Sequence, residues 1–144
     1  MKKLIALLLV SIAFMAPLFA QNADAVLGTW LSEEKDAKIL IYKTGDKYFG
    51  KLVWLKTPYE ADGKTPKTDK KNGSAALRSR PLQNLVILTN FSYDDGAWED
   101  GKIYDPESGK TYSSTMKIEG NNLRLRGYIG ISAFGRTAVW TKSN

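Results

Sequence analysis

The sequence predicts an all-β fold: a small antiparallel, mostly meander β-barrel of about eight strands, preceded by an N-terminal signal peptide. Short runs rich in β-branched and aromatic residues alternate with clusters of Gly, Asn, Asp and Pro, at intervals of about 8–12 residues that are typical of sandwiches and barrels. Within several runs, apolar and polar side chains alternate, as in a strand with one buried face. Closing the sheet removes its exposed edges, so we favour a barrel over a two-sheet sandwich.

The first twenty residues have the three parts of a secretory signal. Lys2 and Lys3 form the basic start, residues 4–15 form an apolar run, and Ala20 follows Pro17 at the expected cleavage point. A membrane-spanning helix needs about 20 apolar residues, so this shorter run favours cleavage over an uncleaved anchor. We therefore expect residues 1–20 to be removed and 21–144 to form a single β-barrel domain, exported to the periplasm or secreted from the bacterial envelope. An integral membrane protein is not expected.

Eight strands are expected, and turn residues separate most of them. In the strand over residues 111–119, Tyr112, Met116 and Ile118 share one side, and Gly120-Asn121 forms a hairpin into the next strand. The expected strands cover residues 28–33, 37–43, 47–55, 85–93, 98–104, 111–119, 122–128 and 136–142.

The chain contains no histidine and no cysteine. Most nucleophilic triads, zinc sites, haem sites and thiol chemistry therefore have no residues to use, and we expect no cofactor and no metal. Cleavage of the signal removes two of the 21 basic residues and lowers the net charge from +6 to +4. This charge is too small to indicate nucleic acid binding. No catalytic motif is recognised, so an enzyme is the less favoured interpretation.

A long polar stretch over residues 56–81 separates the third and fourth expected strands. It carries seven basic and three acidic residues, and so long a loop in a compact domain is often functional. This basic loop either faces water or contacts an envelope protein. Within it, Arg78 and Arg80 either form a fork for a carboxylate or phosphate, or pair with an acidic turn residue such as Asp69 or Asp105.

One dense group of acidic residues lies further along the chain. It could supply a two-carboxylate hydrolytic pair or a calcium site, or its members could bond to their own turns. The group consists of Asp94, Asp95, Glu99, Asp100, Asp105 and Glu107.

The leading functional hypothesis is a non-catalytic barrel that binds a small amphipathic or acidic ligand at its mouth. Aromatic side chains on strands suit the apolar wall of such a pocket, although they would also suit a filled core. An interaction or inhibitor module that uses the basic loop ranks second, and a carboxylate-based hydrolase ranks third. The expected ligand-binding residues are Trp54, Tyr104 and Tyr112 for the wall, with Arg78, Arg80 and Lys110 for the head group.

Several segments in consistent order carry a family resemblance. They are Gly28-Thr29-Trp30, residues 50–55, residues 77–82, Ile103-Tyr104-Asp105-Pro106 with residues 109–112, residues 126–130 and Phe134-Gly135-Arg136-Thr137. In these segments the chain resembles domain of unknown function 2147, a family of small exported bacterial proteins.

The resemblance implies a lipocalin-like β fold and no established activity. In lipocalin-like barrels, the Trp of a Gly-x-Trp motif closes one end under a basic residue of the last strand, which assigns these structural roles to Trp30 and Arg136. The resemblance also implies a lost disulfide pair, because many relatives carry cysteines where this chain has Phe49 and Ser114. Such a pair would make the two strands neighbours.

Overall fold

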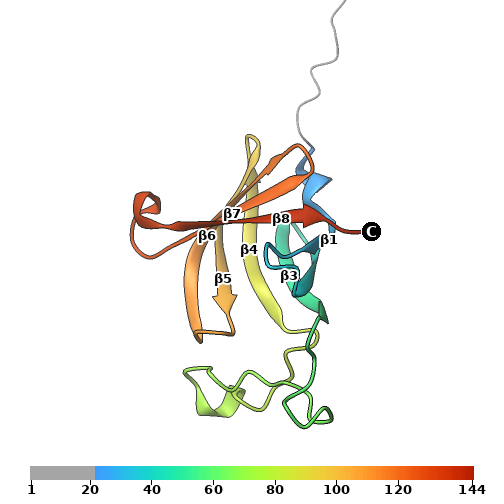
Figure 1. Ribbon diagram of the computed structural model, residues 1–144. Coiled ribbons are helices and arrows are strands. Elements are labelled where there is room, and N and C mark those ends of the chain that lie inside the picture. Colours follow the sequence, from blue (N-terminus) through green and yellow to red (C-terminus); the bar gives the residue numbers. More distant parts are fainter. Residues whose placement is uncertain (1–21) are drawn as a thin grey trace, which may run out of the picture.

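The computed structural model describes residues 22–144, and the expected signal peptide lies outside the described residues. Eight antiparallel strands form a closed barrel in chain order (Figure 1). The all-β meander is confirmed. The strands are β1 (Gly28–Leu31), β2 (Ala37–Thr44), β3 (Lys47–Leu55), β4 (Val86–Asp94), β5 (Ala97–Asp105), β6 (Lys110–Glu119), β7 (Asn122–Tyr128) and β8 (Arg136–Lys142). In the described part of the chain, no helix has the length and apolar character needed to cross a membrane.

The barrel interior is filled at one end. Trp30, Tyr48, Phe91 and Trp98 are all buried there, and the short helix η1 (Ala23–Val26) covers them. The indole N–H of Trp30 donates to the carbonyl oxygen of Val26, at 2.8 Å. The indole N–H of Trp98 donates to the Ala23 carbonyl, so both buried indoles at this closed end are hydrogen-bonded to η1.

The cation over Trp30 is not the one that the resemblance assigned. Lys142, at the end of β8, places its Nζ 4.8 Å from the centre of the Trp30 ring and donates to the Leu27 carbonyl. Arg136 begins β8 and therefore lies at the opposite end of the barrel. The prediction that Arg136 closes the barrel is wrong. The first residue of β8, Arg136, lies far from Trp30, and the strand reaches Trp30 only at its last residue, Lys142.

The implied neighbourhood of Phe49 and Ser114 is also wrong. Phe49 lies on β3, which pairs with β2 and β4, whereas Ser114 lies on β6, which pairs with β5 and β7. Phe49 stacks on Tyr42 with ring centres 5.9 Å apart, while Ser114 is buried. A disulfide between cysteines at these two positions would therefore not fit this barrel.

The other end of the barrel carries the four longer connections. In a meander, the loops after the first, third, fifth and seventh strands share one end. They comprise residues 32–36, 56–85, 106–109 and 129–135. The longest of them extends beyond the barrel below β3 and β4 (Figure 1), and we call this end the mouth.

Candidate functional site

The mouth opens into a cavity of about 530 Å³. Its inner wall consists of apolar side chains from consecutive strands: Ile103 of β5, Tyr112 of β6, Leu125 of β7, and Ala138 and Trp140 of β8. Ile129 and Phe134, on the loop between β7 and β8, form an apolar edge and are 74% and 83% exposed. A concave, mainly apolar space of this size is typical of small-molecule sites.

The cavity exists because the inward positions near the mouth are small. Gly127 and Ala138 take inward positions on β7 and β8, whereas bulky rings fill the closed end. A Cβ atom at Gly127 would already lie 3.6 Å from atoms of Ile103 and Tyr112. Larger residues at these positions would therefore occupy the space that a ligand would use.

Five carboxylates line this cavity at its rim: Glu33, Glu34, Asp36, Asp105 and Glu107. The loop between β1 and β2 supplies the first three, and the end of β5 and its turn supply the others. Among the described residues, none of the five forms an ion pair. The rim therefore carries a concentration of negative charge, and Arg136 is the one cation that lines this cavity among residues 22–144.

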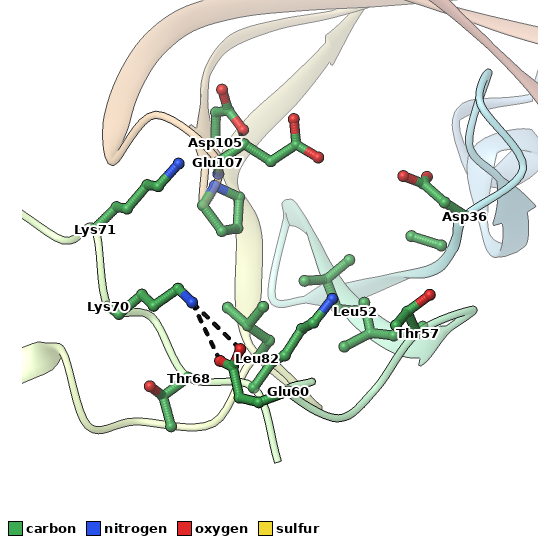
Figure 2. A pocket seen from close by; sticks show the side chains of 14 residues that line it. Asp36, Leu52, Thr57, Glu60, Thr68, Lys70, Lys71, Leu82, Asp105 and Glu107 are labelled. Carbon is green, nitrogen blue, oxygen red and sulfur yellow. Dashed lines mark hydrogen bonds and ion pairs between the residues drawn. The ribbon is translucent and has the colours of Figure 1, made fainter. Parts of the chain in front are cut away.

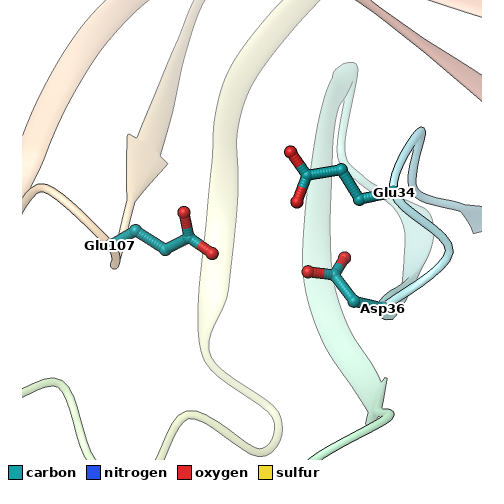
Figure 3. A group of neighbouring side chains, drawn as sticks. All are labelled: Glu34, Asp36 and Glu107. Atoms are coloured by element: carbon teal, nitrogen blue, oxygen red, sulfur yellow. The ribbon is translucent and has the colours of Figure 1, made fainter.

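Three of these carboxylates converge. Glu34 and Asp36 extend from one side and Glu107 from the other (Figure 3), and one carboxylate oxygen of each lies within 4.8 Å of the other two. Two unit charges at that distance repel by about 0.9 kcal/mol even in water. Oxygen ligands of this type suit a hard cation such as Ca²⁺, or the ammonium group of an organic molecule.

The Ser32 hydroxyl organises this loop. It accepts the backbone N–H groups of Asp36 and Ala37, both at 3.1 Å, and donates to the Asp36 carboxylate at 2.7 Å. These bonds end β1 at Leu31, two residues earlier than expected, and they hold Asp36 at the rim.

A second cavity, of about 380 Å³, adjoins the mouth beneath the long loop (Figure 2). It shares Asp36, Asp105 and Glu107 with the mouth cavity. Lys67, Lys70 and Lys71 also line it, and Lys70 pairs with Glu60 at 3.3 Å. The second cavity therefore combines part of the acidic rim with basic residues of the long loop.

The long loop is held to the barrel through Asp69, whose side chain is fully buried. Arg80 contacts the Asp69 carboxylate at 2.8 Å, the Asn72 amide donates to it at 2.9 Å, and the Tyr104 hydroxyl donates to it as well. Burial, followed by the bond to Asp69, raises the pKa of Tyr104 above its ordinary value. We call Asp69, Asn72, Arg80 and Tyr104 the loop latch.

Close packing of the loop against the barrel also requires a glycine. A Cβ atom at Gly109, in the turn after β5, would collide with the backbone carbonyl of Lys71, and Gly109 has a φ of +71°. Only glycine combines that conformation with such a close approach at little cost.

The family profile described as "Uncharacterized protein conserved in bacteria (DUF2147)" matches residues 28–142, which span the barrel from β1 to β8. The chain belongs to this family. No curated protein matches it. A similar solved structure is that of protein HP1028 from the human pathogen Helicobacter pylori, which is described as belonging to the lipocalin family. The TM-score is 0.71 at 22% identity, and the match covers 82% of each chain. At this identity the likeness shows the fold alone, and it confirms the lipocalin-like barrel.

In this member of the family, one of the six expected ligand-binding residues, Tyr112, lines the mouth cavity. Lys110 is exposed at the first position of β6, opposite Asp105. Arg80 is paired with Asp69, which is one of the two pairings left open by the sequence, and Arg78 donates to the carbonyl of Asn72. The two guanidinium groups therefore do not form the expected fork for a ligand, because each is bonded to a residue of its own loop.

The expected positions of Trp54 and Tyr104 are corrected for a common reason. Each follows a β-bulge, which adds one residue to its strand and reverses the faces beyond it. On β3, the register to β2 shifts opposite Lys38 and Ile39. Beyond this shift the Trp54 side chain points out of the barrel, where it is 40% exposed and lies beneath the ammonium group of Lys38. A shift between Trp98 and Gly101 turns Tyr104 outward, where its hydroxyl donates to Asp69.

The acidic group expected from the sequence is divided between the two ends of the barrel. Asp94 and Asp95 lie at the turn into β5, at the closed end, whereas Asp105 lies at the mouth. Asp100 and Asp105 are separated by about 17 Å of strand, so these two carboxylates cannot act together as a two-carboxylate pair.

Sequence reasoning missed Glu34 and Asp36, which are the residues that join Glu107 at the mouth. The signal available was topological: in a meander, the first and fifth strands are followed by loops at the same end.

Proposed function

We propose that this protein binds a small molecule with an apolar body in the mouth cavity of its barrel. The observation that carries this proposal is the space of about 530 Å³ left by inward-facing side chains of β5 to β8. The interior of a barrel of about eight strands can hold one small ligand. The likeness to a lipocalin-family structure supports a barrel of this kind.

The proposal differs from the sequence-based hypothesis in the polarity of the ligand. An acidic head group was expected because of Arg78 and Arg80, but these side chains contact Asn72 and Asp69 instead of the mouth. An acidic head group is therefore not part of the proposal.

Titration with the neutral fluorescent probe N-phenyl-1-naphthylamine tests the proposal. We expect saturable binding of one probe per barrel, with enhanced probe fluorescence and quenching of Trp140. Ala138→Phe fills the cavity and should weaken binding at least tenfold, whereas Thr141→Phe, on an exposed position of the same strand, should not change it.

A second variant avoids the core. Phe134→Ser changes an exposed edge residue and should weaken probe binding about threefold or more without loss of stability. Absence of saturable binding by the unchanged protein would overturn the proposal. Unchanged affinity in both the Ala138→Phe and Phe134→Ser variants, with native circular dichroism spectra, would also overturn it.

We further propose that the protein acts in the bacterial envelope, as the basic and apolar segments of residues 1–20 predict. Mass spectrometry of the protein from fractionated cells tests this. Recovery from the cytoplasm with residues 1–20 intact would contradict the proposal.

A further inference from the structure

The mouth cavity differs in charge from the rest of the protein. The whole chain carries a net charge of +6, yet among the residues that the structure describes, five carboxylates and a single cation, Arg136, line this cavity. Since none of these carboxylates has an ion-pair partner in residues 22–144, their charge is available to an incoming group.

The rings of the cavity supply an independent observation. Tyr112, Tyr128, Phe134 and Trp140 line it, and aromatic faces attract organic cations, quaternary ammonium groups above all. Elsewhere in the described chain the protein places its own cations over five rings, those of Trp30, Tyr42, Tyr48, Trp54 and Tyr104. None of those five rings belongs to the mouth cavity.

We propose that the ligand of this cavity is a cationic amphiphile, an apolar chain or ring that bears an ammonium group. The apolar body lies among Ile103, Leu125 and Trp140, and the ammonium group lies between the two acidic loops, near Glu34, Asp36 and Glu107. This inference rests on the proposed function and names the ligand class of the same site.

Competition against N-phenyl-1-naphthylamine tests the inference with three probes that share a ten-carbon chain. The probes are decyltrimethylammonium, decanol and decanoate, used at neutral pH and below their aggregation concentrations. We expect the ammonium probe to bind at least tenfold more tightly than decanoate, with decanol between them, because their head groups present a positive, a negative and no charge to the acidic rim.

The variant Glu34→Gln/Asp36→Asn/Glu107→Gln should weaken decyltrimethylammonium binding at least tenfold and leave decanol within about twofold. The matched control, Asp94→Asn/Asp95→Asn/Glu99→Gln, removes the same charge away from the mouth and should leave both affinities nearly unchanged. These side chains lie outside the core, so both triple variants should keep the thermal transition of the parent.

The outcomes separate the two proposals. If no ten-carbon probe binds, the ligand-binding function itself fails. If decanol or decanoate binds as tightly as the ammonium probe, or if the mouth variant loses all three probes equally, the cationic class is overturned. If Ca²⁺ binds with one-to-one stoichiometry and excludes decyltrimethylammonium, the carboxylates form a metal site and the inference is also overturned.

Discussion

Replacing Arg80 with alanine tests the physical account of the loop latch. The change leaves the fully buried Asp69 carboxylate without its ionic partner, while the bonds from Asn72 and Tyr104 remain. Removal of one partner from a fully buried ion pair costs about 3–5 kcal/mol. The Arg80 side chain is 36% exposed, so water already weakens the pair, and we expect a cost of about 2–3 kcal/mol.

The cost should appear first as local detachment of the loop. Because each 1.4 kcal/mol corresponds to a factor of ten, the detached population should rise by about 30- to 150-fold. Limited trypsin digestion measures this population, since Lys64, Lys67 and Lys71 lie in the loop. Cleavage under conditions where the barrel stays folded should accelerate by the same factor.

Two controls separate the latch from surface charge. Glu60→Gln breaks the Lys70–Glu60 pair, whose lysine is 64% exposed, and an exposed pair of this type contributes at most about 1 kcal/mol. Asp69→Asn combined with Arg80→Ala should cost less than the sum of the single changes, because no buried charge is left unpaired. If Arg80→Ala and Glu60→Gln accelerate cleavage equally, or if neither does, the assignment of the latch is refuted.

Three further predictions concern the barrel itself. Lys142→Met should lower the free energy of unfolding in urea by about 0.5–1 kcal/mol, by removing the cation over the closing indole, whereas an equal or larger loss in Arg136→Met would refute this assignment. Gly50→Ala brings a methyl group to 2.7 Å from a buried leucine and should cost about 1–3 kcal/mol; Gly73→Ala, with no atom within 4 Å, should be neutral in the same thermal melt. Burial, with the bond to an aspartate, raises the pKa of Tyr48 to about 12. Stability that is present below pH ~10, the value for unfolded tyrosine, should therefore fall between about pH 10 and 12, and a Tyr48→Phe variant with the same fall would contradict this cause.

The strands were predictable because their sequence pattern is local. β3, β7 and β8 have the expected bounds, since turn residues such as Gly120 and Asn121 limit them and side chains alternate between them. In the other five strands, at least one boundary differs from the expected one by one or two residues, as at Leu31, where the hydroxyl of Ser32 ends the strand. Helix and strand ends depend on such individual hydrogen bonds, and alternation alone does not identify them.

The site was harder to predict because one inserted residue changes the face of every residue beyond it. Trp54 and Tyr104 both fit the inward face if alternation continues, and both point outward after a bulge. A bulge depends on the pairing of two strands, which the sequence of one strand does not contain. Tyr112 lies on β6, where the register to β7 is unbroken, and it takes the expected inward position.

The amino-acid sequence by itself determined the eight extended segments, the meander order and the absence of histidine and cysteine, because composition and alternation are properties of the chain alone. The tertiary structure decided which charges meet. Glu34 and Glu107 are 73 positions apart in the chain, yet barrel closure brings their carboxylates together at the mouth, while Arg80 pairs with the buried Asp69 of its own loop. Electrostatic interactions depend on distances in space. In this protein those distances are set only when the last strand pairs with the first and the barrel closes.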